Sequence, residues 1–211
     1  MFETAIVAFT TFFATVGPLD VAAMFAVLTP NASPAARRSM AWRGVLISAG
    51  ILIAFALIGD FILHNLGISL AALRVAGGIL LLLIGIDMVF ALNTGGTTTT
   101  EAETSEAVGK QDISAFPLAT PLIAGPGTMG AVILLMANSR DDLGAQAMVV
   151  AALLTVLLIT LLLLLLAGAV HRVLGVTALN VVGRIFGVLL TALAVQFMFD
   201  GLAASGLIPA A

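Results

Sequence analysis

Six apolar segments, each about as long as a membrane-crossing helix, constrain this chain more than any other feature. They cover residues 3–29, 40–64, 68–92, 113–138, 145–170 and 177–203. A helix needs about 20 apolar residues to cross a hydrocarbon core of about 30 Å. Backbone polar groups inside a bilayer must be bonded within the protein, so segments of this length indicate helices. The sequence therefore predicts an all-α integral membrane protein with six transmembrane helices and the lipid bilayer as its surroundings.

The composition agrees with this class and excludes several others. Hydrophobic residues make up 61% and charged residues 9% of the chain, against about half and about a quarter in soluble domains. The absence of cysteine excludes disulfides and thiolate metal sites. His64 and His171 are expected in loops at opposite membrane faces, so we expect no metal site, no cofactor and no enzymatic activity. No basic run indicates a nucleic-acid partner, and no polybasic cluster indicates a site for anionic lipids. The oligomeric state stays open, a homo-oligomer included.

The second half of the chain resembles the first. "GPLDVAAMFAVL" from Gly17 and "GPGTMGAVILLM" from Gly125 begin 108 positions apart. We therefore divide the chain into a three-helix repeat (1–92), a cytoplasmic polar linker (93–112) and a second three-helix repeat (113–211). Because three is an odd number of spans, the second repeat enters the membrane from the opposite face. Inverted repeats of this kind are typical of secondary transporters.

Each repeat begins with a helix that a Gly-Pro pair interrupts near its middle. Proline removes a backbone hydrogen bond and clashes with the preceding turn, so breaks are expected at Gly17-Pro18 and Gly125-Pro126. A half-helix that restarts after a break presents free N–H groups and a positive dipole end. These can hold an anionic group without a basic side chain. The alternative for either pair is a simple kink, since glycine and proline are common in transmembrane helices.

Asp20 and Thr128 occupy matching positions after the two breaks. Asp20 could accept from the ammonium group of a zwitterion, and the Thr128 hydroxyl with nearby backbone N–H groups could donate to its carboxylate. The predicted substrate-binding residues are Gly17, Pro18, Asp20, Gly125, Pro126, Gly127 and Thr128. Asp20 could equally cap the restarted half-helix or carry a proton.

Four charged residues inside the spans form two pairs of opposite sign at matching depths. Asp87 is level with Arg184 toward the predicted cytoplasmic face, and Arg74 is level with Asp200 toward the outer face. An isolated charge at the membrane centre costs at least about 2.5–3.5 kcal/mol, so partners are expected, and such links would suit alternating gates. Static bridges or snorkelling side chains are the alternative, which we favour for Arg74 and Asp200.

Basic residues near the span ends predict the orientation, because cytoplasmic loops carry the excess of Lys and Arg. One side has Arg37, Arg38, Arg43, Lys110 and Arg172, and the other has Arg74 and Arg140. Both termini are therefore expected outside.

"FPLATPLIAGPGTMGAVI" and "TVGPLDVAAMFAVLT", with six spans and a polar linker after the third, resemble the MarC family (UPF0056). The resemblance covers nearly the whole chain. It departs at Gly17, because the family commonly has asparagine or aspartate before this proline, whereas here the acid follows at Asp20. The resemblance implies a multi-pass protein of the bacterial inner membrane, with some relatives transporting small neutral amino acids such as glycine and alanine.

The sequence thus predicts a secondary transporter that moves a small neutral amino acid, or a similar small solute, by alternating access. Proton coupling follows if Asp20 titrates. The alternatives are a lipid-carrier flippase, a drug or metabolite exporter, and a membrane scaffold without transport activity. A flippase needs a basic site for a phosphate headgroup, for which Arg184 and Arg74 are the candidates.

Overall fold

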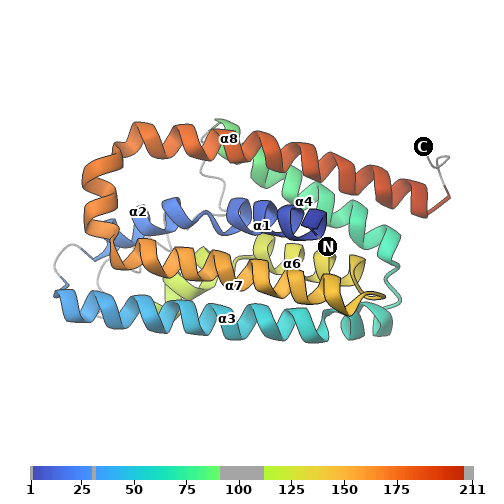
Figure 1. Cartoon of the computed structure of the whole chain (residues 1–211), viewed down its shortest axis with the longest axis horizontal. Coiled ribbons are helices and arrows are strands. Elements are labelled where there is room, and N and C mark those ends of the chain that lie inside the picture. The colour runs from blue at the N-terminus through green and yellow to red at the C-terminus, as the bar shows by residue number, and fades with distance from the viewer. Residues whose placement is uncertain (1, 30–31, 91–111, 207–211) are drawn as a thin grey trace.

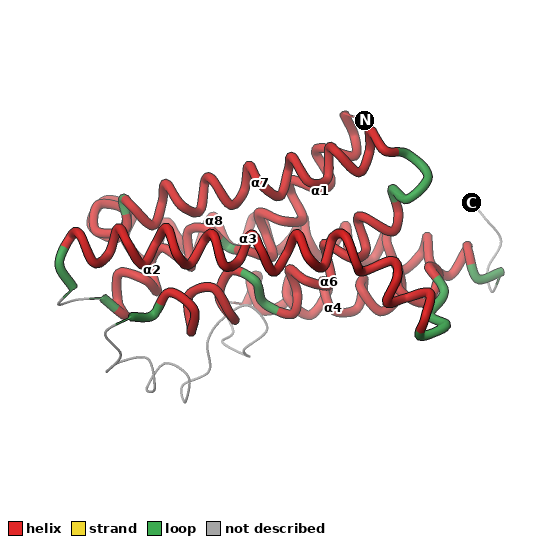
Figure 2. The backbone as a smooth tube through the Cα atoms, turned by 90° about the horizontal axis from the view of Figure 1, so that it is seen from below, coloured by secondary structure: helices red, strands yellow, loops and turns green. Residues whose placement is uncertain are grey.

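The computed structural model describes residues 2–29, 32–90 and 112–206, of which the side chains at 27, 60, 168–180 and 182–183 lie outside the description. Within these ranges all regular structure is helical, which confirms the predicted class. Figures 1 and 2 show an elongated bundle whose helices run along its long axis. The predicted linker 93–112 lies outside the described residues except for Asp112.

The helices follow the predicted apolar segments closely. In chain order they are α1 (Phe2–Val16), α2 (Pro18–Leu28), α3 (Pro34–Asn65), α4 (Leu70–Phe90), the interrupted η1 (Ser114–Ile123), α6 (Pro126–Asn138), α7 (Leu143–Leu165) and α8 (Ala167–Ala204). Five spans, one of them Phe2–Ala26 across α1 and α2, are long and apolar enough to cross a membrane. The bent pair of η1 and α6 brings the number to six if it is counted as one span.

The last helix differs from the prediction. The sequence suggested a turn at 171–175 between two segments, whereas α8 is helical from Ala167 onward. The stretch contains glycine but no proline, and a glycine inside a helix costs only about 1 kcal/mol. In Figure 1 the first turns of α8 stand across the end of the bundle before the helix runs back along it. The part that meets the membrane-span criteria is Arg184–Ala204.

The two halves pack through small residues where α4 meets α8. A Cβ added at Gly85 of α4 would lie 2.6 Å from Cγ2 of Thr191, and one at Gly187 of α8 would lie 2.9 Å from Cβ of Met88. Such contacts let helix backbones approach closely, which is how helices associate inside a membrane. Elsewhere α1 packs on α7, and α6 packs on α3 and α4.

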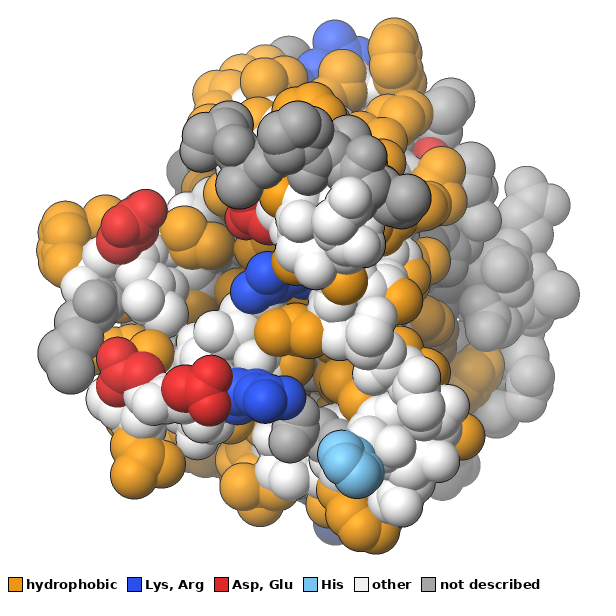
Figure 3. Space-filling model, turned by 90° about the vertical axis from the view of Figure 1, so that its right-hand side faces the viewer, with side chains coloured by type: hydrophobic (Ala, Val, Ile, Leu, Met, Phe, Trp, Pro, Cys, Tyr) orange, Lys and Arg blue, Asp and Glu red, His pale blue; other side chains and the backbone are white. Residues whose placement is uncertain are grey.

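The start of α1 and the end of α8 lie at the same end of the bundle (Figure 1). This agrees with an even number of crossings. Figure 3 looks onto that end and shows acidic and basic side chains among apolar ones. The connection from α6 to α7 lies at this end (Figure 1). In it Nε of Arg140 lies 3.7 Å from Oδ1 of Asp141, and Asp142 accepts from the backbone N–H groups of Gly144 and Ala145. The opposite end carries the arginines at the start of α3.

Candidate functional site

The first break lies between α1 and α2 and consists of a single glycine. Gly17 has φ 58° and ψ 59°, the left-handed conformation that side-chain-bearing residues avoid. Its N–H donates to the carbonyl of Phe13 at 3.1 Å and its carbonyl accepts from Val21 at 2.9 Å. Pro18 follows as the first residue of α2, and no side chain caps this helix start. The first N–H groups of α2 are therefore available at the middle of the span.

Asp20 turns back over this break. Its Oδ2 lies 3.3 Å from the position that a Cβ at Gly17 would take. The side chain is exposed at the protein surface, although it sits within a membrane-spanning segment. A carboxylate in the first turn of a helix is stabilised by the positive end of the helix dipole. Asp20 makes no capping hydrogen bond at this helix start, and its roles as ligand and as proton carrier stay predictions.

The second break, between η1 and α6, is wider, since the two helices differ in direction by 55°. Pro117 and Pro121 lie inside η1, and η1 is not a continuous helix. The residue before each proline, Phe116 and Thr120, is extended (φ −138°, ψ 127° and φ −132°, ψ 125°). Gly125 is extended (φ −78°, ψ 168°) and comes directly before Pro126 at the start of α6. A Cβ at Gly125 would lie 2.6 Å from the carbonyl oxygen of Pro121, so only glycine permits this approach. As at the first break, no side chain caps the restarted helix.

The two breaks meet through a hydrogen bond. The hydroxyl of Thr128, in the first turn of α6, donates to the backbone carbonyl of Thr15, near the end of α1, at 3.2 Å. Both residues are buried. The last carbonyls of a helix have no N–H partner within it, and Thr128 supplies a donor to one of them. The structure thus joins the segments around Gly17 and Gly125 that the sequence placed in one site.

The centre of the molecule consequently holds four helix ends. α2 and α6 begin there and run toward opposite ends of the bundle, while α1 and η1 end there (Figure 1). Helix starts offer N–H donors and helix ends offer carbonyl acceptors. The donors are complementary to an anionic group and the acceptors to a cationic one.

Thr11 is a residue of this region that sequence reasoning missed. It lies one turn before Thr15 on the same face of α1, is fully buried, and its hydroxyl has no hydrogen-bond partner among the described residues. Thr15, by contrast, donates to the carbonyl of Thr11 at 2.9 Å. Two threonines spaced by four inside an apolar span could have indicated a polar stripe on that helix face.

The Cα of Gly127 packs against a side chain of α4. A Cβ added there would lie 2.3 Å from Cδ1 of Ile84 on α4. The Cα of Gly127 therefore faces the packing between α4 and α6. Its backbone N–H remains part of the uncapped first turn of α6.

Arg74 and Asp200 have hydrogen-bond partners other than each other, and the pairing of Asp87 with Arg184 stays a prediction. Arg74 instead donates from Nε to the side-chain oxygen of Asn138 at 2.6 Å. Asp200 accepts from the side-chain amide of Gln196 at 2.8 Å. Arg74 thereby links the start of α4 to the end of α6.

Comparison with known proteins identifies relatives over nearly the whole chain. A UPF0056 membrane protein of Methanocaldococcus jannaschii is 39% identical over 93% of this chain and 95% of its own length. UPF0056 membrane protein YvbG of Bacillus subtilis is 32% identical over 96% of this chain and 95% of its own. UPF0056 membrane protein YhcE of Escherichia coli is 33% identical over 90% of this chain and 87% of its own length. No solved structure matches.

The family comparison covers the same extent. Residues 2–205 match the family described as "MarC family integral membrane protein". This range includes both Gly-Pro breaks and every span. The chain therefore belongs to the MarC family of integral membrane proteins.

Proposed function

We propose that this protein is a secondary transporter that moves a small neutral amino acid, such as glycine or alanine, or a similar small solute. The observation that carries the proposal is the junction of the two broken helices, where Thr128 bonds the carbonyl of Thr15 between two uncapped helix starts. Unpaired backbone groups at this depth are tolerated where they face protein or a watery cavity. Secondary transporters bind substrates at such discontinuous helices near the membrane midplane.

The groups at this centre support the proposed substrate class. The N–H groups at the starts of α2 and α6 are suited to a carboxylate. The Asp20 carboxylate and the carbonyls at the ends of α1 and η1 are suited to an ammonium group. A small neutral amino acid presents both groups and has little side chain to place between closely packed helices.

The alternating access rests on the packing between the halves. α1 packs on α7 and α6 on α3, while α4 packs on α8. If 1–92 and 113–211 are inverted repeats, exchanging them turns the contact of α1 with α7 into that of η1 with α3, and the contact of α6 with α3 into that of α2 with α7. Both of these contacts are present, and the contact of α4 with α8 maps onto itself. A scaffold of this kind can rock between two equivalent states with the site at its centre. Asp20, the acidic residue at the junction, is the proposed proton carrier.

The test is uptake by proteoliposomes that contain the purified protein. We expect radiolabelled glycine or alanine to accumulate when an inward proton gradient is imposed. Asp20→Asn should lose at least about tenfold in uptake, whereas Asp141→Asn, which changes an exposed carboxylate at the bundle end, should match the wild type. Ligand bound only by the folded state also raises the melting temperature. If no neutral amino acid is taken up or shifts the melting temperature, but a lipid phosphate does, the flippase takes the place of this proposal.

A further inference from the structure

A pocket at the arginine-bearing end of the bundle is separate from the central junction. Its volume is about 490 Å³, and it lies between the start of α3 and the junction of α7 with α8. Pro34, Arg37 and Arg38 line one side, and Leu164, Leu165 and Leu166 line the other. The described residues that line it include no acidic side chain.

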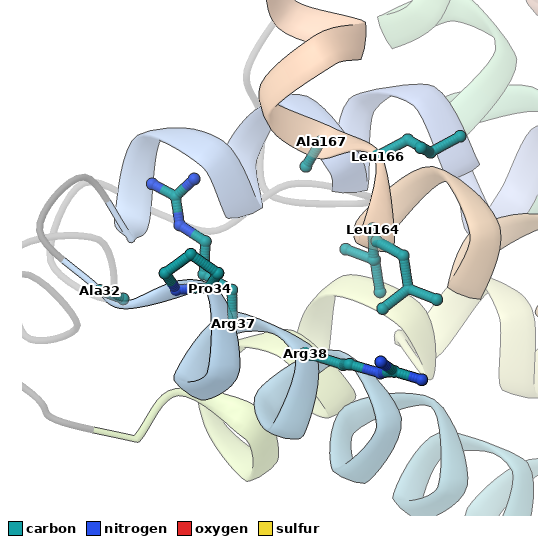
Figure 4. Close-up of a pocket in the computed structure, with 8 residues that line it drawn as sticks. Ala32, Pro34, Arg37, Arg38, Leu164, Leu166 and Ala167 are labelled. Atoms are coloured by element: carbon teal, nitrogen blue, oxygen red, sulfur yellow. The ribbon is translucent and has the colours of Figure 1, made fainter.

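The two arginines reach in different directions from the first turns of α3 (Figure 4). Arg37 extends toward α2 and donates to the carbonyl of Thr29, which holds its guanidinium in place. Arg38 extends toward Leu164 of α7, and its side chain is exposed. Arginine presents a planar fork of donors that matches the geometry of a phosphate group. The start of α3 adds the positive end of a helix dipole to the same side of the pocket.

The leucine wall continues onto the outer surface of α7. Leu158, Leu162 and Leu165 are 55%, 51% and 40% exposed and recur every three or four residues, so they form one stripe that ends at the pocket. In a membrane this stripe faces lipid. An acyl chain can follow the stripe while its headgroup meets the arginines. A free phosphate would use the arginines but would leave the apolar wall without a role.

We propose that this pocket binds the phosphate headgroup of an anionic phospholipid, with Arg38 as its principal contact. The sequence rule for anionic-lipid sites requires a cluster of about four to eight basic residues beside a span, and "RR" at 37–38 does not meet it. The fold compensates by joining two arginines to an apolar wall more than 120 residues later in the chain. This proposal does not depend on the transported substrate.

Trp42 provides a direct probe. It is the only tryptophan of the chain, it lies one helical turn after Arg38 on α3, and it is 45% exposed. Lipids with brominated acyl chains quench a tryptophan that they contact. The protein is reconstituted in phosphatidylcholine vesicles with rising fractions of either brominated phosphatidylglycerol or brominated phosphatidylcholine. We expect phosphatidylglycerol to reach half-maximal quenching at about a fivefold lower mole fraction, the preference that one arginine near an anionic surface provides.

Three variants and a competitor make the result decisive. Arg38→Gln should remove the preference for phosphatidylglycerol, Arg38→Lys should keep most of it, and Arg140→Gln, which removes an exposed arginine at the opposite end, should leave it unchanged. Arg37 is left intact because it holds the end of α2. Equal quenching by both lipids in the wild type, or a preference that survives Arg38→Gln, would overturn the proposal. Loss of the preference in 50 mM inorganic phosphate, at constant ionic strength, would point to a free phosphate and overturn it as well.

Discussion

The Thr128 hydroxyl of one half of the chain donates to the Thr15 backbone carbonyl of the other half across 3.2 Å. The two residues are 113 positions apart and each lies within three residues of a Gly-Pro pair. The bond fixes the start of α6 against the end of α1. It therefore couples the two interrupted spans to each other. The two spans can move relative to each other at this point only if the hydrogen bond is broken.

Replacing Thr128 by valine tests this coupling with little change in shape. We expect the free energy of unfolding in detergent to fall by about 1–3 kcal/mol, the cost of leaving a buried hydrogen-bond acceptor unpaired. Substrate uptake per folded protein should also fall, because the bond joins the two helix breaks of the proposed site. The control is Thr155→Val, because the Thr155 hydroxyl is exposed and bonds only the carbonyl of Ala151 on its own helix. Equal uptake by the two variants would mean that the bond has no part in transport.

Gly127 offers a test of how α6 packs on α4. Gly127→Ala places a methyl group 2.3 Å from Cδ1 of Ile84, and overpacking of this kind costs about 1–3 kcal/mol. Ile84→Val removes the colliding carbon. The double variant should therefore recover much of the stability lost in Gly127→Ala, measured by thermal unfolding. Additive losses in the double variant would contradict the contact.

Much of the fold follows from the sequence because the bilayer leaves few choices. The apolar runs locate the spans, and the proline positions place both breaks at the residues where the structure has them. The start of the last span is the exception. The interrupted form of η1 was not predictable, since two prolines in "FPLATPL" show that a regular helix fails but do not show which backbone conformation replaces it. The helical stretch after Ala167 was not predictable, because its charged residues and glycine are typical of a turn, although the absence of proline permits a continuous helix.

The site could be predicted only in part. The glycines and prolines at the breaks mark backbone positions, and backbone effects are local, so the sequence locates them well. Partner choice depends on the rotation of each helix, which the sequence leaves free. The predicted pair of Arg74 and Asp200 rested only on their similar depth in the membrane, whereas in the structure Arg74 donates to Asn138. Depth in the membrane also could not predict the hydrogen bond from Thr128 to Thr15.

The start of η1 makes stability depend on pH. Hydrogen bonds from Ser114, and then Arg43 at 3.0 Å, hold the pKa of Asp112 below its ordinary value. A depressed pKa means that the carboxylate stabilises the fold above the pKa of the unfolded chain, about 3.9, and loses this effect as pH falls through the folded pKa. The melting temperature of the wild type should therefore exceed that of Asp112→Asn at pH 6 and converge with it in acid.

Arg43→Gln separates the two causes of this shift. Because Ser114 contributes more than Arg43, Arg43→Gln should reduce the acid-dependent loss of stability without abolishing it. The measurement is the melting temperature of the wild type and both variants at several pH values between 3 and 6. A constant difference between the wild type and Asp112→Asn over this range would show that Asp112 stays in one protonation state throughout.

The orientation can be tested because the chain contains no cysteine, so a single introduced thiol is the only one that a maleimide can label. Ala35→Cys lies at the arginine-bearing end, and Asp141→Cys lies at the end that holds the start of α1; both positions are exposed. The excess of arginine at the start of α3 predicts that its end faces the cytoplasm. In intact cells a membrane-impermeant maleimide should therefore label Asp141→Cys within minutes and leave Ala35→Cys unlabelled until the membrane is opened. The reverse labelling pattern would show that the topology is opposite to the predicted one. The Arg38 pocket would then lie in the outer leaflet, and the quenching of Trp42 by phosphatidylglycerol would have to be measured with lipid added from that side.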